Sequence, residues 1–103
     1  MAGTIKAEVV VLGAGPGGYV SAIRLAQLGK KVVLVDKDNL GGICLNYGCI
    51  PSKAMISASE FFNKIKESDK MGISVSNISM NFGKMQEWKD KIVLKLNKGI
   101  EFL

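Results

Sequence analysis

The fold is decided by the stretch Glu8-Val9-Val10-Val11-Leu12-Gly13-Ala14-Gly15-Pro16-Gly17-Gly18. Its first five residues form a short apolar run rich in β-branched side chains, which predicts a buried strand of a parallel sheet. Gly13, Gly15 and Gly18 follow at once with the spacing G-x-G-x-x-G. Gly-rich turns occur in many proteins. The flanking residues must therefore decide whether this spacing belongs to a dinucleotide-binding unit.

Those residues supply a βαβ unit. Residues 19–28 have a helical composition and Gly29 ends the segment, while residues 31–35 form a second apolar run with Asp36 at its carboxyl end. In such a unit the glycines permit the tight turn, the approach of a pyrophosphate and close helix–strand packing, and the acid accepts from a ribose hydroxyl. Two alternatives stay open, an ordinary Gly-rich turn and a capping role for Asp36. The unit alone does not separate NAD from FAD.

A second stretch, residues 41–53, reads Gly-Gly-Ile-Cys-Leu-Asn-Tyr-Gly-Cys-Ile-Pro-Ser-Lys and holds both cysteines, Cys44 and Cys49. In an ideal helix a separation of five residues places the Cα atoms ~8.6 Å apart. A disulfide needs less than ~7 Å, so the pair can close only if the helix is distorted between them. Gly48 relaxes the backbone there, and Pro51 suits the first turn of a new helix. Cys49 is thus expected near a helix start, where the positive end favours a thiolate.

The cysteines have other interpretations. They can be buried small apolar residues, and a static disulfide would need a secretory context. A zinc site needs about four ligands, whereas the chain has two Cys and no His, so we expect no metal. Three features favour a redox-active pair instead. They are the glycines Gly41 and Gly42 before the cysteines, the spacing that distorts the helix, and Lys53 one turn after Cys49.

Composition sets broad limits. The 103 residues make one small domain at most, with 48% hydrophobic residues and a net charge of +5. The lysines are scattered and lack a basic block or aromatic platform, so no nucleic-acid partner is expected. No apolar run approaches the ~18 residues of a membrane span, and residues 1–6 do not resemble a signal peptide. We therefore expect a cytoplasmic chain that does not enter a membrane.

The second half of the chain is predicted to be mainly helical. One helix is expected over residues 51–68, then a polar stretch with a turn and a short extended piece at residues 72–75. A second amphipathic helix is expected from about Phe82, packed on the cysteine-bearing helix. Its apolar stripe comprises Met85, Trp88, Ile92, Leu96 and Leu103.

Residues 41–53 resemble the active-site signature of the class I pyridine nucleotide–disulfide oxidoreductases. The form Cys-Leu-Asn-x-Gly-Cys-Ile-Pro-Ser-Lys is most similar to that of the dihydrolipoamide dehydrogenases. The resemblance implies an α/β fold: residues 1–103 would be the N-terminal portion of a Rossmann-like FAD/NAD(P)-binding domain, a βαβ unit followed by two long helices. The NAD and dimerisation domains would be absent from this chain.

The resemblance also implies an activity. The complete enzyme would oxidise a dihydrolipoyl group on the lipoyl-bearing protein of a 2-oxoacid dehydrogenase or glycine cleavage complex. Electrons would pass through the disulfide and FAD to NAD+, in a homodimer. Cys44 would be the thiol that the substrate attacks, Cys49 the thiolate beside the flavin, and Lys53 would lie near the reactive edge of the ring. The ADP and pyrophosphate half would be held by Gly13, Gly15, Gly18, Asp36, Lys37, Gly41 and Gly42.

The chain departs from the family pattern in several places. Asp36 is one methylene shorter than the usual Glu, Ile43 replaces Thr or Val, and Tyr47 replaces Val. The family's catalytic base is a His–Glu pair from the partner subunit, and a chain without His cannot supply it. We therefore expect residues 1–103 alone to be inactive. The alternatives are a related flavin disulfide or mercuric reductase, although Ser52 argues against a glutathione reductase, and a non-catalytic nucleotide-binding module.

Overall fold

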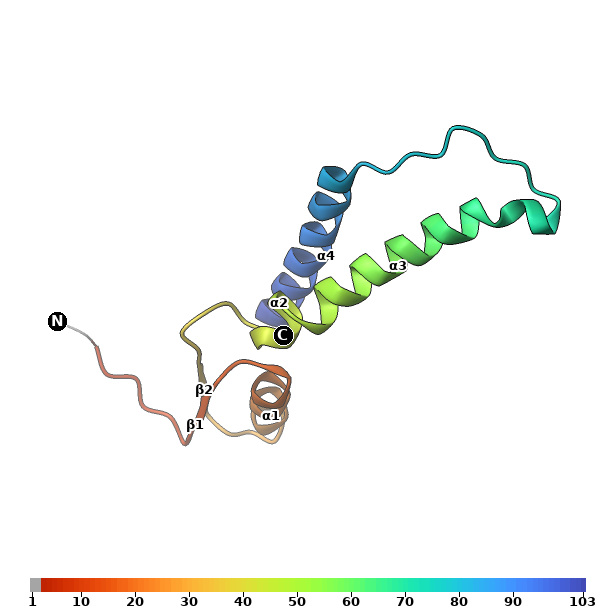
Figure 1. Ribbon diagram of the computed structural model, residues 1–103. Helices are drawn as coiled ribbons and strands as arrows, with labels where there is room; N and C mark the ends of the chain where they lie inside the picture. Colours follow the sequence, from red (N-terminus) through yellow and green to blue (C-terminus); the bar gives the residue numbers. More distant parts are fainter. Residues whose placement is uncertain (1–2) are drawn as a thin grey trace.

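The computed structural model describes residues 3–103. Its elements alternate between strand and helix at first and are helical thereafter (Figure 1). In chain order they are β1 (Val9–Leu12), α1 (Pro16–Gln27), β2 (Val32–Val35), α2 (Gly42–Asn46), α3 (Cys49–Lys66), the 3-10 helix η1 (Ser68–Met71) and α4 (Phe82–Phe102). This order confirms the α/β class, with a βαβ unit followed by two long helices.

Residues 9–35 build the βαβ unit. β1 and β2 pair in parallel, from Val9 opposite Val32 to Leu12 opposite Val35. α1 begins at Pro16, earlier than the sequence predicts, because proline lacks the N–H that a first helical turn leaves unpaired in any case. Gly29 has a φ of +82° just beyond the end of α1, as expected for a glycine that ends a helix.

Gly18 sets how closely α1 lies on the strand before it. A Cβ built on Gly18 would overlap the carbonyl oxygen of Gly13 and lie 2.8 Å from its carbonyl carbon. The same Cβ would lie 3.7 Å from Val11 Cγ1. The turn between β1 and α1 therefore closes only around a residue without a side chain.

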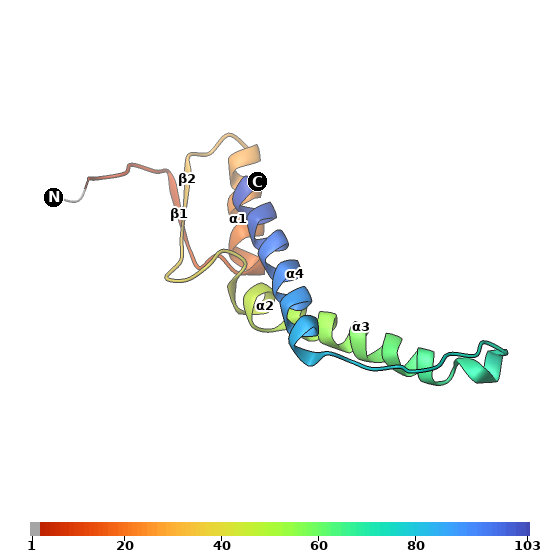
Figure 2. The ribbon, with the colours of Figure 1, turned by 90° about the horizontal axis from the view of Figure 1, so that it is seen from above.

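The long helices carry the chain away from the sheet and back. α3 begins at Cys49, η1 follows it, and residues 73–81 form neither helix nor strand, so the expected extended piece at residues 72–75 pairs with nothing among the described residues. α4 starts where Asn81 Oδ1 accepts from the N–H of Lys84 at 2.9 Å. Figure 2 shows α4 running back along the start of α3 and past α2 towards α1, and α4 contacts both α2 and α3.

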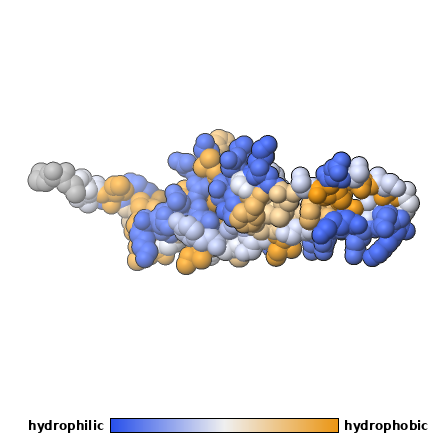
Figure 3. Space-filling view, turned by 45° about the horizontal axis from the view of Figure 1, so that its top comes forward, coloured by the Kyte–Doolittle hydropathy of each residue, from blue (hydrophilic) through white to orange (hydrophobic). Residues whose placement is uncertain are grey.

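The molecule is elongated, and its apolar residues are poorly covered. The radius of gyration is 20.1 Å, against about 13 Å for a compact domain of this length. Among the described residues no large side chain is fully buried, and the core consists of Ala14, Ala22, Leu45 and Ala54. Apolar residues instead reach the surface in several separate patches (Figure 3).

The apolar stripe of α4 is covered only in part. Met85 and Ile92 are half-buried, but Trp88 is 45% exposed and Leu103 78% exposed. The predicted packing of α4 on the cysteine-bearing helix is therefore present, whereas full burial of the stripe is not. None of the helices in residues 3–103 combines the length and apolarity that crossing a bilayer requires.

The Gly18 packing gives a testable prediction. Gly18→Ala should lower the free energy of unfolding by about 1–3 kcal/mol, the usual cost of overpacking, because the new methyl overlaps the Gly13 backbone. Gly17→Ala is the matched control, since a Cβ there meets nothing within 4 Å. Urea unfolding of the two variants measures the difference, and equal stability would contradict the packing account.

Candidate functional site

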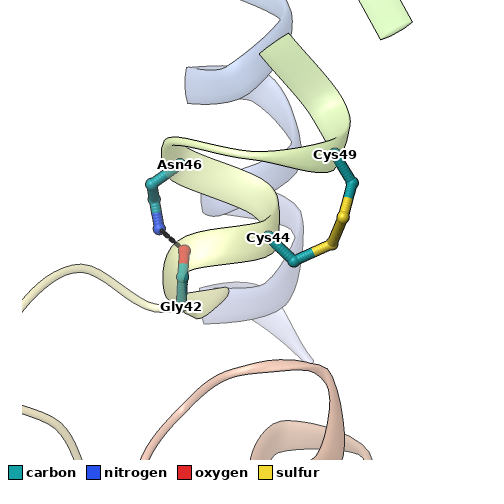
Figure 4. The surroundings of a disulfide bond; sticks show 4 residues. All are labelled: Gly42, Cys44, Asn46 and Cys49. Carbon is teal, nitrogen blue, oxygen red and sulfur yellow. Dashed lines mark hydrogen bonds between the residues drawn. A yellow bond between two sulfur atoms is a disulfide. The ribbon is translucent and has the colours of Figure 1, made fainter. Parts of the chain in front are cut away.

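The two cysteines lie on either side of a break in the helix. α2 ends at Asn46, Tyr47 and Gly48 leave helical geometry with φ values of −131° and −121°, and α3 restarts at Cys49. The break brings the Cα atoms of Cys44 and Cys49 to 4.8 Å, and the sulfurs form a disulfide (Figure 4). The predicted distortion of the helix between the cysteines is therefore confirmed. Cys49 is the more exposed of the two.

Two asparagines hold the broken helix in place. Asn46 Nδ2 donates to the carbonyl oxygens of Gly42 and Leu40 at 2.9 and 3.0 Å. Asn97 reaches the same place from α4, where its amide donates to Leu40 O and, at 3.3 Å, to Asn46 Oδ1. Sequence reasoning missed Asn97, since a polar residue at the edge of an apolar stripe gives no signal of a contact 57 positions away.

The start of α1 offers free hydrogen-bond donors. Gly15 caps the helix without a side-chain hydrogen bond, and the first turn contains no acid. Within residues 3–103 no backbone or side-chain acceptor takes the N–H groups of Gly17 and Gly18. Free N–H groups at the positive end of a helix form a site suited to an anion such as phosphate.

The glycine pair before Cys44 rests on this turn. Gly41 N–H donates to the carbonyl oxygen of Ala14 at 2.8 Å. Gly42 approaches so closely that a Cβ built on it would lie 2.6 Å from Gly15 Cα. Gly41 and Gly42 have φ values of +97° and +64°, which also favour glycine. The structure thereby brings residues 13–18 and 41–49 together.

Asp36 ties the end of β2 to the same turn. Its Oδ2 accepts from Ala14 N–H at 2.6 Å and its Oδ1 from Asp38 N–H at 2.9 Å. The hydrogen bond from Ala14, followed by that from Asp38, lowers the pKa of Asp36 below its ordinary 3.8. Asp36 does not cap a helix, because the next helix begins at Gly42 with Gly41 as its N-cap; the bond from Asp38 closes a local turn instead. Each carboxylate oxygen keeps a further lone pair for a ligand hydroxyl.

Two cavities border this assembly. One of about 210 Å³ lies between the turn at residues 36–39 and the segment Gly42-Ile43, with Tyr47 on its wall. The other, about 230 Å³, is mainly apolar and lies beside Cys44, bordered by Leu45 and Leu96. A larger cavity between α3 and α4, about 460 Å³, is lined by Phe61 and Trp88 and lies away from the sulfurs.

The side chains of the two lysines expected at the site, Lys37 and Lys53, form no hydrogen bond or ion pair within the described residues. Lys37 follows Asp36 in the turn, and Lys53 lies one turn after Cys49 on α3; both are exposed. Over the same residues, no three His, Cys, Asp or Glu side chains gather as metal ligands would.

The structure thus combines the glycine turn of a βαβ unit with a disulfide on the adjoining broken helix. Residues 7–103 match the family described as pyridine nucleotide-disulphide oxidoreductase, and the chain belongs to that family. The resemblance seen in residues 41–53 is therefore confirmed over residues 7–103.

Individual relatives give a finer comparison. The chain is 59% identical over 99 residues to the dihydrolipoyl dehydrogenase of Geobacillus stearothermophilus, covering 96% of this chain and 21% of the relative. Identity is 55% over 96 residues to a dihydrolipoyl dehydrogenase of Bacillus subtilis, covering 93% and 20%. It is 54% over 99 residues to that of Staphylococcus aureus, covering 96% and 21%. The chain thus spans about one fifth of the length of these relatives.

The lowered pKa of Asp36 predicts a pH dependence. A carboxyl with a lower pKa in the folded state stabilises the fold above its unfolded pKa of about 3.9. That contribution is lost as the pH falls through the folded value. Asp36→Asn should remove this part of the acid dependence and lower stability at neutral pH. Urea midpoints between pH 2 and pH 7 measure it, and an identical pH profile in both proteins would contradict it.

Proposed function

We propose that this chain forms the nucleotide-binding and disulfide-bearing part of an FAD-dependent dihydrolipoyl dehydrogenase. The observation that carries the proposal is the Cys44–Cys49 disulfide, held by Gly41 and Gly42 against the glycine turn of a βαβ unit. Relatives that bear this name match nearly the whole chain, which favours it over a mercuric or other disulfide reductase and over a non-catalytic module.

The residues present fit the ADP half of FAD. Gly13 supplies a turn with a φ of +98°, and the free N–H groups at the start of α1 suit the pyrophosphate. Asp36 has lone pairs for a ribose hydroxyl, and Lys37 lies beside it in the turn. When bound, FAD would supply two-electron transfer between the cysteine pair and NAD+. In our proposal Gly13, Gly15, Gly18, Asp36, Lys37, Gly41, Gly42 and Lys53 are its ligands.

The cysteines would carry out thiol–disulfide exchange. One thiolate of dihydrolipoamide attacks the sulfur of Cys44, a mixed disulfide forms, and Cys49 leaves as a thiolate. The second substrate thiolate then attacks the substrate sulfur of the mixed disulfide, so that oxidised lipoamide leaves and Cys44 becomes a thiolate that takes up a proton. The substrate loses two electrons and the protein disulfide gains them.

The position of Cys49 suits the leaving role. It is the first residue of α3, whose 18 residues present a positive end to the sulfur, and no acidic residue lies in the first turn. Helix starts lower the pKa of a cysteine thiol. Lys53 adds a positive charge one turn further on. Residues 1–103 contain no His. In our proposal the proton acceptor for the dihydrolipoyl thiol therefore lies outside these residues, in the partner subunit of the homodimer that the complete protein would form.

The proposed partners follow from the substrate. A dihydrolipoyl group is carried by the lipoyl-bearing protein of a 2-oxoacid dehydrogenase or glycine cleavage complex, and the enzyme would meet it in the cytoplasm. Cys49 is an exposed residue, whereas Cys44 is half-buried and lines the cavity of about 230 Å³.

The roles of the two cysteines can be separated by absorption spectroscopy. The protein from the complete gene, loaded with FAD and reduced by two electrons, should show a long-wavelength band from the Cys49 thiolate beside the oxidised ring. Cys49→Ser should abolish this band, whereas Cys44→Ser should keep it. A band that survives in Cys49→Ser and disappears in Cys44→Ser would reverse the assignment.

Residues 1–103 alone should not catalyse the oxidation of dihydrolipoamide. A sheet of two strands is only marginally stable by itself, and large apolar side chains are exposed, among them Leu12 at 80%. In addition, no His is present to accept the substrate proton. The purified chain incubated with FAD, dihydrolipoamide and NAD+ should form no NADH, as measured by ultraviolet absorbance. Sustained NADH formation would contradict the expected inactivity of residues 1–103, but not the proposed activity of the complete protein.

A further inference from the structure

Tyr47 links the cysteine segment to the turn after β2. It lies between Cys44 and Cys49, where the helix is broken, and its hydroxyl donates to Asp38 Oδ2 at 2.8 Å. The hydrogen bond to Asp38 and the negative charge of Asp38 raise the pKa of Tyr47 above its ordinary value. Sequence reasoning gave Tyr47 no role.

Asp38 connects Tyr47 to the glycine turn through Asp36. Its backbone N–H donates to Asp36 Oδ1 at 2.9 Å, and Asp36 Oδ2 accepts from Ala14 N–H at 2.6 Å. The other oxygen of Asp38 accepts from Asn39 N–H at 2.8 Å. A continuous path of hydrogen bonds therefore runs from Tyr47 through both aspartates to the turn between β1 and α1.

The same link holds together two walls of a cavity. The cavity of about 210 Å³ has the turn at residues 36–39 on one side and Gly42, Ile43 and Tyr47 on the other. Asp36 stands at the carboxyl end of β2, where a parallel sheet of this type receives the ribose of a dinucleotide. Across this cavity the Tyr47 hydroxyl donates directly to Asp38 Oδ2.

We propose that Tyr47 is a positioning residue for the adenosine half of the bound dinucleotide, acting through Asp38. This inference rests on the proposed function, because the ligand is the FAD assigned there. A turn that is already held in place needs less ordering when the nucleotide binds, and the ordering cost would otherwise be subtracted from the affinity. Tyr47 is 63% exposed, so the hydrogen bond competes with water and its effect is moderate.

The test is a titration of the flavin-free protein, made from the complete gene, with FAD and separately with ADP. Tyr47→Phe keeps the ring and removes the donor, and should weaken both ligands by about three- to tenfold, as the loss of one hydrogen bond of moderate strength implies. Asp38→Ala should weaken them similarly, and the double variant should be no worse than the weaker single one. Tyr19→Phe is the matched control, because its hydroxyl has no hydrogen-bond partner within residues 3–103, and it should bind as the wild type does.

The outcomes separate the inference from the proposed function. Unchanged affinities in Tyr47→Phe would overturn the inference, even if the melting temperature of the flavin-free protein fell. A loss for FAD with none for ADP would also overturn it, since Tyr47 would then act on the flavin half. If the wild-type protein binds neither ligand, the proposed function is wrong and the inference falls with it.

Discussion

The close backbone contact between Gly15 and Gly42 determines how the rest of the site is arranged. A Cβ on Gly42 would lie 2.6 Å from Gly15 Cα, and the neighbouring Gly41 N–H donates to Ala14 O at 2.8 Å. Any side chain at position 42 would push the two segments apart. Because both contacting residues are glycines, the disulfide segment lies next to a helix start that has free N–H groups. This proximity is the basis of the proposed electron transfer.

The helix break and the disulfide depend on each other through the same backbone. Tyr47 and Gly48 leave helical geometry, which reduces the distance between the cysteine Cα atoms to 4.8 Å. Asn97 from α4 then ties the segment to the far end of the chain through Leu40 and Asn46. This region is better connected than the ends of α3 and α4, where large apolar residues remain exposed.

Much of this arrangement could be predicted from local patterns. The apolar runs located β1 and β2 to within one residue, and the five-residue cysteine spacing, with Gly48 and Pro51, indicated the break before α3. The start of α1 was missed because Gly-Pro-Gly-Gly has a low helix propensity, whereas the turn geometry imposes a helix there. The contacts of Asn97 and Tyr47 had no local signal, because each depends on residues that only the fold brings near. The cofactor roles of the glycines, Asp36 and the lysines stay predictions.

A crystal structure of the protein from the complete gene with FAD bound tests the central claim most directly. The account predicts that the pyrophosphate accepts from the N–H groups of Gly17 and Gly18, and that the flavin ring contacts the sulfur of Cys49 rather than that of Cys44. A flavin bound elsewhere, or one with both sulfurs turned away from its ring, would contradict the account.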